Sequence, residues 1–162
     1  MSTPKTPYSP AAAASNSMTG MARYTVGLNN VGSYQVSSIP FITGSSGSAG
    51  DNKNLNAGAE KQFTFPFVTK ALTVINTDGD TSTGGPIRVH FNSTASSDRV
   101  INGMHYVSLN STDDSVTLNV KCKEVWISST SAGAARSFTI IADLTQIPSS
   151  RMFTLTGSGL TD

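Results

Sequence analysis

Apolar and polar side chains alternate in short runs over most of the chain from residue 34 onward, which is typical of β-strands with one buried face. The clearest run is QFTFPFVT at 62–69, where Phe63, Phe65 and Phe67 share one face. Pro66 lies on the opposite face and removes one backbone donor, so we expect an edge strand or a bulge there. After a tight break, the more continuously apolar run 72–76 predicts a central strand.

Further runs with the same period predict more strands. In the run 87–92, Ile87, Val89 and Phe91 are expected to face inward, and the polar residues between them, His90 included, outward. The turn-forming clusters that separate the strands lie at 44–50, 77–85, 94–98, 110–114 and 129–134. The other expected strands are 104–109, 116–120, a returning strand at 124–128, 137–145 with Phe138, Ile140, Ala142 and Leu144 buried, and 151–156.

Eight or nine short strands, with turns at spacings of about ten residues, predict an all-β fold. We expect an antiparallel β-sandwich or jelly roll over residues 31–162, with a closed barrel as the competing shape. No helical period of useful length occurs between residues 34 and 156. No internal repeat or heptad is present, so the sequence does not encode a fibre shaft.

Residues 1–30 have a different character and predict an extended N-terminal arm. Pro4, Pro7 and Pro10 favour extended backbone, and the alanine-rich run that follows has no apolar period. Two interpretations remain open: a disordered tail, or an arm that becomes ordered on a partner. We expect removal of residues 1–30 to leave a folded domain that has lost its partner.

The stretch VGSYQVSSIPF joins this arm to the domain. In extended backbone Tyr34 and Val36 share one face, while Ile39 and Phe41 fall on the other. The double serine between the two pairs predicts a bulge or a crossover, and Pro40 is expected to stop regular pairing. The stretch is therefore expected to be a hinge.

Charge is scarce in this chain: 13% of residues are charged, against about 25% in an ordinary soluble domain. A surface of hydroxyls and amides suits a protein that packs against other proteins, although it also suits a secreted β-domain. The net charge is +1, and the first fifty residues contain only the cations Lys5 and Arg23. We therefore expect no nucleic-acid partner.

Cys122 is the only cysteine, so an intrachain disulfide is excluded and folding in a reducing cytoplasm is expected. No signal peptide or membrane-spanning length is visible, which predicts synthesis in the cytoplasm and no membrane partner. In a chain so rich in serine and threonine, the N-x-[ST] sequons at Asn92 and Asn110 are interpreted as chance.

Catalytic chemistry has little support, and we predict neither an enzyme nor a cofactor. His90 and His105 lie on different predicted strands without metal-ligand spacing; His90 is expected at the surface and His105 partly buried. Cys122 lies between two lysines, which can lower a thiol pKa, but a strand cysteine is more often structural. A carboxylate pair of Glu124 and Asp143 across strands is the only glycosidase-like candidate.

Two loop motifs and one aromatic residue leave ligand binding open. Asp78-Gly-Asp80 and Asp113-Asp114 could supply oxygen ligands to calcium, but these residues are also ordinary turn formers. Trp126 has the opposite parity to its apolar neighbours. It is expected either outside, as a platform for a sugar or a partner, or buried by a loop or a second subunit.

Three stretches of the sequence resemble pieces of small virion proteins from tailed phages of aquatic bacteria, cyanophages included. The resemblance spans roughly residues 27–162, and such proteins are capsid decoration (cement) proteins or head fibres. The three stretches are GLNNVGSYQV at 27–36, KCKEVWI at 121–127 and FTLTGSGLTD at 153–162.

The resemblance implies a domain that stands on the capsid and an arm that spreads over the major capsid protein. It also implies a location on the virion and a symmetric homo-oligomer, a trimer or dimer. The partner-binding residues predicted for the arm and hinge are Tyr8, Arg23, Tyr24, Tyr34 and Phe41. Two alternatives stay open: a carbohydrate-binding module of a tail or fibre, and an adaptor or tube component of the tail.

Overall fold

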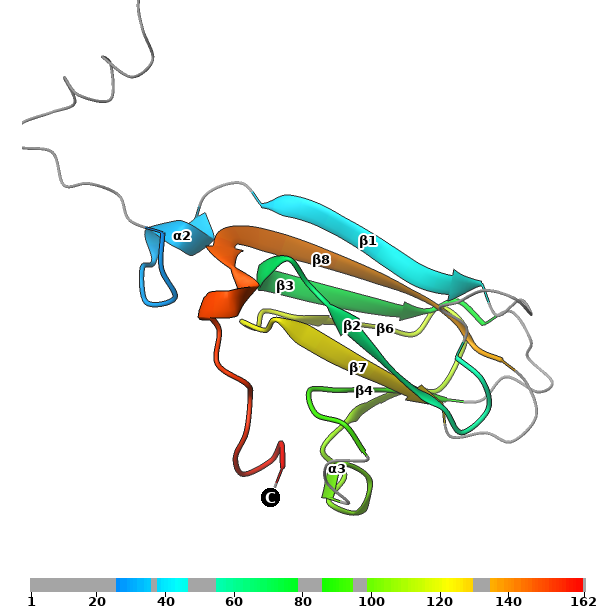
Figure 1. Ribbon diagram of the computed structural model, residues 1–162. Coiled ribbons are helices and arrows are strands. Elements are labelled where there is room, and N and C mark those ends of the chain that lie inside the picture. The colour runs from blue at the N-terminus through cyan, green and yellow to red at the C-terminus, as the bar shows by residue number, and fades with distance from the viewer. Residues whose placement is uncertain are drawn as a thin grey trace, which may run out of the picture.

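Two four-stranded antiparallel sheets face each other in the computed structural model, and together they form a β-sandwich (Figure 1). The strand order is β1-β8-β3-β6 in the first sheet and β2-β7-β4-β5 in the second. Each sheet has two free edges, so the fold is a sandwich and not a closed barrel. The structure describes residues 26–35, 38–46, 55–78, 86–94, 99–129 and 135–161.

The strands of the first sheet are β1 (Ile39–Ser46), β8 (Ser137–Pro148), β3 (Phe67–Asn76) and β6 (Ser115–Leu118). Those of the second are β2 (Glu60–Thr64), β7 (Glu124–Ser129), β4 (Ile87–His90) and β5 (Val107–Leu109). Within the described ranges, three short helical segments accompany them: α2 (Gly32–Gln35), α3 (Arg99–Asn102) and the 3-10 turn η1 (Ser149–Arg151). None of the helices described is long and apolar enough to cross a membrane.

The core lies between the sheets and is built from the side chains that face inward on each strand. The inward residues expected on β8 (Phe138, Ile140, Ala142, Leu144) are all buried, which confirms that prediction. Edge-to-face aromatic pairs pack within this core. The rings of Phe63 and Phe138 lie 5.5 Å apart, and those of Phe41 and Phe65 lie 5.3 Å apart.

Pro66 marks a crossing between the sheets, a role that alternation alone did not identify. The run 62–69 is not one strand: β2 ends at Thr64 on an edge of the second sheet, and β3 begins at Phe67 in the first. The expected break before residue 72 is also wrong, because β3 continues to Asn76 with register shifts near Thr69. Its central position in the sheet is confirmed.

The hinge prediction was wrong in two respects. Tyr34 lies in α2, which starts after Asn30; the Asn30 side chain accepts a hydrogen bond from Gly32 N at 3.0 Å. This local cap favours a helical turn over extended backbone. Pro40 does not stop pairing, because it lies within β1 opposite Asp143. An edge strand tolerates proline, since the missing donor can face solvent.

Two further strand predictions were wrong. The segment 151–156 is not a strand: η1 covers its start, and irregular backbone follows. The strands β6 and β7 do not form a hairpin, because β6 pairs with β3 and β7 pairs with β2 and β4. Alternation shows which face of a strand is buried, but it does not show which sheet the strand joins.

An ion pair is buried beside the core, where the Arg136 guanidinium donates to the Asp78 carboxylate at 2.9 Å. Arg136 is fully buried and forms an isolated bridge with Leu55. Because a buried charge is costly without its counter-charge, this pair fixes the Arg136 side chain against Asp78, which follows β3.

Replacing Asp78 with alanine should lower the free energy of unfolding by about 3–5 kcal/mol, because the buried Arg136 guanidinium then loses the carboxylate that accepts its hydrogen bond at 2.9 Å. Urea denaturation followed by circular dichroism measures the change. Asp143→Ala, a half-buried carboxylate on the outer face of β8, is the control and should cost less than about 0.5 kcal/mol. Equal losses for the two variants would contradict the role given to the ion pair.

Gly44 should be irreplaceable by alanine, because a Cβ there would lie 2.3 Å from the Phe138 carbonyl oxygen on β8. A backbone atom cannot move aside without disturbing the β1–β8 pairing, so we expect a loss of about 1–3 kcal/mol of stability. Gly27→Ala is the matched control, since no atom lies within 4 Å of its Cβ position. Thermal denaturation that shows the two variants equally stable would refute this expectation.

Candidate functional site

The three sequence stretches that carry the resemblance meet at one end of the sandwich. Leu28 comes from the first stretch, Lys121 from the second and Phe153 from the third, and all three line the same cleft of about 430 Å³. We call it the arm-root cleft, because the segment that enters the domain from residue 26 forms one wall. Its lining residues are Leu28, Asn29, Lys121, Met152, Phe153 and Leu155.

Long side chains from distant parts of the fold hold this wall by its backbone. Lys121 Nζ donates to the Leu28 carbonyl at 2.8 Å, and the Tyr34 hydroxyl donates to the same oxygen at 3.1 Å. Arg151 donates to the Val26 carbonyl at 3.0 Å. The Lys121 ammonium also lies 4.3 Å from the centre of the Tyr34 ring, a cation–π contact. Charged donors make strong hydrogen bonds, so residues 26–28 have a fixed position on the domain.

A small apolar cluster lies beneath the cleft. Val68, Ile147 and Met152 are buried, and Val26 and Leu28 pack against them together with Tyr34 and Leu155. Residues 26–30, assigned to the arm from sequence, therefore include two side chains that pack on the domain. Burial also raises the pKa of the Tyr34 hydroxyl, so this group remains a donor at neutral pH.

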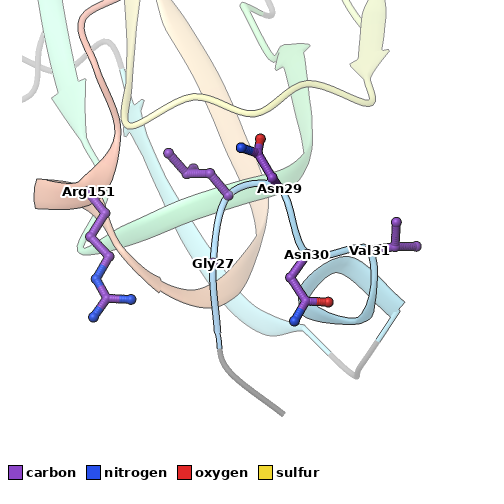
Figure 2. Close-up of a pocket in the computed structure, with 6 residues that line it drawn as sticks. Gly27, Asn29, Asn30, Val31 and Arg151 are labelled. Carbon is purple, nitrogen blue, oxygen red and sulfur yellow. The ribbon is translucent and has the colours of Figure 1, made fainter. Parts of the chain in front are cut away.

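Two large apolar side chains are exposed at this end of the domain. Phe153, which lines the arm-root cleft, is 67% exposed, and Val31, which lines an adjoining open depression, is 68% exposed. Figure 2 shows the loop from Gly27 to Val31 on one side of an adjoining open depression and Arg151 on the other. Exposed apolar side chains beside an apolar cleft are typical of a protein-binding surface.

The predicted partner-binding residues do not all lie at this site. Tyr34 does, where it orients the cleft wall through Leu28. Phe41 does not: it belongs to β1, is half-buried against the core and packs on Phe65. Tyr8, Arg23 and Tyr24 lie outside the described residues. Sequence reasoning did not single out Lys121, Arg151 or Phe153, although two of the stretches quoted for the resemblance contain Lys121 and Phe153.

A polar network covers the outer face of the second sheet, and it corrects the prediction for His90. That residue is 1% exposed, because Glu60 and the segment after β4 lie over it. Its Nδ1 donates to the Asn92 carbonyl at 2.6 Å, since a carbonyl can only accept, and Nε2 accepts from Ser128 Oγ at 2.9 Å. Burial lowers the pKa of His90, which favours this neutral form.

Glu60 completes the network by accepting hydrogen bonds from the Ser93 hydroxyl and from Thr94 N, each at 2.7 Å. The order of Ser128, His90 and a carbonyl is that of a nucleophile, a base and an orienting acceptor. Both side chains are more than nine-tenths buried, however; the bonds to Asn92, Ser93 and Thr94 hold the segment after β4 onto the sheet, and the bond between His90 and Ser128 links β4 to β7. A structural role therefore accounts for the arrangement.

Cys122 is buried, and its surroundings disfavour the thiolate form. The Thr69 hydroxyl donates its proton to the Val120 carbonyl at 2.6 Å. The Cys122 sulfur lies 3.2 Å from the Thr69 hydroxyl oxygen, so the thiol is the donor of this second hydrogen bond. Burial raises the pKa of Cys122 to about 11, and the lysines on either side do not reverse this effect. The structural interpretation of this cysteine is supported.

The remaining ligand candidates separate in the structure. Within the described residues, no group of three or more His, Cys, Asp or Glu side chains could hold a metal ion. Asp78 pairs with Arg136, and Asp80 lies outside the described ranges. Glu124 and Asp143 belong to different sheets and are not paired. His105 is partly buried as expected, and its Nδ1 has no hydrogen-bond partner among described residues.

Comparisons with known proteins identify no match to this chain. No family model, no curated protein and no solved structure matches the chain.

The Cys122 thiol should react with a maleimide at pH 8 at least about 100-fold more slowly in the native protein than in urea, because a pKa near 11 leaves little thiolate. Mass spectrometry of quenched samples measures both rates. Since the folded state disfavours the thiolate, its contribution to stability should fall as the pH rises from about 9 towards 11. Native labelling as fast as labelling in urea would contradict the burial of this group.

Proposed function

We propose that this protein is a capsid decoration (cement) protein of a tailed phage, which binds the major capsid protein through residues 1–25 and the arm-root cleft. One observation carries the proposal: the three stretches that resemble virion proteins lie far apart in the sequence but line one cleft. A resemblance confined to scattered core residues would support a shared fold alone. A resemblance that converges on an exposed apolar surface supports a shared contact.

The fixed wall of the arm-root cleft gives the arm its function in this proposal. Ordering a flexible segment costs about 1–2 kcal/mol per residue, and contacts with the shell must offset that cost. The Lys121 and Arg151 hydrogen bonds fix residues 26–28 before binding, so these residues do not add to that cost. Tyr8, Arg23 and Tyr24 then provide contacts on the capsid, while Phe153 and Val31 bury their exposed surfaces beside them.

The low charge of the chain agrees with this function. With 13% charged residues, the protein can place a large surface against a shell without desolvating many ions. Several copies on one particle, or several arms in one oligomer, raise the effective concentration of each contact. A decoration protein therefore needs only modest affinity at each cleft.

A second candidate is carbohydrate binding by a tail or fibre domain. It rests on Trp126, which is partly exposed on the outer face of β7 between Gln62 and His90 in the strand register. An indole flanked by polar groups can stack on a sugar. Quenching of tryptophan fluorescence by host polysaccharide would favour this candidate.

The other alternative is an adaptor or tube component of the tail. That role would place the protein in purified tails and not in heads.

Deleting residues 1–25 should leave a folded domain that does not bind capsids lacking the protein. The deletion stops at residue 25, not 30, because Val26 and Leu28 pack on the domain. Co-sedimentation with such capsids measures occupancy, and circular dichroism confirms the fold. Full occupancy by the truncated protein would overturn the role of the arm.

The arm-root cleft is tested by Phe153→Ser in the full chain, which should weaken capsid binding by roughly 10- to 100-fold because an apolar anchor is lost. Met104→Ser is the matched control, since Met104 is 73% exposed but lies next to α3, away from the cleft. Equal affinities for the two variants would remove the cleft from the proposed contact.

A further inference from the structure

A polar pocket of about 280 Å³ lies on the second sheet, apart from the residues of the arm-root cleft. Its lining includes Glu60 from β2, Arg88 from β4 and the adjacent Ser128 and Ser129 from β7. Strand pairing places Glu60 and Arg88 on either side of Ser128, in one row across three strands. The pocket therefore has a carboxylate on one side and a guanidinium on the other.

These two charges do not pair with each other. No ion pair within the described ranges joins Glu60 to Arg88, and two strand spacings of about 4.8 Å separate their backbones. Glu60 is held by the hydrogen bonds that it accepts from Ser93 and Thr94. The Arg88 guanidinium carbon lies 4.4 Å from the centre of the Tyr106 ring, a cation–π contact. Both charged groups are therefore held in place before a ligand enters.

Two buried polar atoms of the pocket residues have no hydrogen-bond partner in the part of the chain that the structure describes. They are Arg88 Nε and Ser129 Oγ. Ser129 is 6% exposed, and a buried donor without a partner lowers stability. Rotation of the Ser129 side chain about χ1 presents its hydroxyl to the pocket that it lines. A ligand that bonds to these two residues would account for their lack of partners.

We propose that this pocket binds a single sugar residue through two neighbouring hydroxyl groups. Arg88 can only donate hydrogen bonds, and the Glu60 carboxylate can only accept them. A phosphate or a carboxylate would be repelled by Glu60, and an ammonium group would be repelled by Arg88. A hydroxyl both donates and accepts, so neighbouring hydroxyls can bond to both charged groups and to Ser129.

The size of the pocket sets the size of the ligand. Its volume of about 280 Å³ is just below the range of about 300–1,000 Å³ that is typical of sites for drug-sized molecules, so it suits one sugar ring. With so few atoms in contact, we expect a dissociation constant of about 1–10 mM. The inference uses neither the arm-root cleft nor Trp126, so it stands or fails separately from both candidate functions.

Ligand-observed NMR of the full chain with D-glucose, D-galactose, D-mannose and N-acetyl-D-glucosamine tests the proposal. At least one of these sugars should show saturation transfer from the protein. Ser129→Ala should weaken its binding about 3- to 10-fold, because one hydrogen bond is lost. Arg88→Met should weaken it at least about 10-fold, because a charged donor is lost. Ser115→Ala, at an exposed position of β6 in the other sheet, is the matched control and should leave the affinity unchanged.

Stability measurements on the same variants separate binding from folding. Because Ser129 Oγ has no partner among the described residues, Ser129→Ala should be no less stable than the wild type in urea. Weaker sugar binding by this variant then reports on the pocket and not on a damaged fold.

Three results would overturn the inference. The first is a lack of saturation transfer from all four sugars at roughly 100 mM, which would leave the pocket to solvent. The second is inorganic phosphate that displaces the sugar and no longer binds to Arg88→Met, which would make this an anion site. The third is equal sugar affinity in Ser129→Ala and Ser115→Ala, which would place the sugar elsewhere on the protein.

Discussion

The pairing of β8 with β1 and β3 is the interaction on which the rest of the structure depends. β8 lies between the two other strands, and its inward side chains supply much of the core. The first sheet therefore forms only when residues near the C-terminal end of the chain meet residues 39–46 and 67–76. Such non-local pairing makes folding slow compared with a helical protein of equal length. It also brings η1 and Phe153, which follow β8, to the point where the chain enters the sandwich.

Alternation was enough to predict a sandwich, because each strand has one buried face and the parity of its residues shows which face that is. Alternation could not predict which strands pair, or which segments cover an outward-facing residue. No local feature of the sequence shows whether Pro66 lies at a crossing between the two sheets or at a β-bulge within one strand. His90 has surface parity, yet it is buried because Glu60, thirty positions away, bridges to the segment that follows β4. The cleft wall depends on bonds from Lys121 and Arg151 to carbonyl groups, which leave no pattern in the sequence.

The arm-root cleft combines apolar side chains with two cations. Lys121 and Arg151 already donate to backbone carbonyls, which fixes where their charges lie but does not neutralise them.

The hydrogen bonds that hold residues 26–28 have a mechanical consequence. A pull applied through the arm reaches the Arg151–Val26 bond first and the bonds at Leu28 only afterwards, because they lie in series along the chain. The load is therefore taken by single side-chain contacts in succession, whereas the eight-residue pairing of β1 with β8 shares any shear among many backbone bonds. Under tension, residues 26–28 should detach from the domain before the sandwich unfolds. The sandwich therefore stays folded when these hydrogen bonds break.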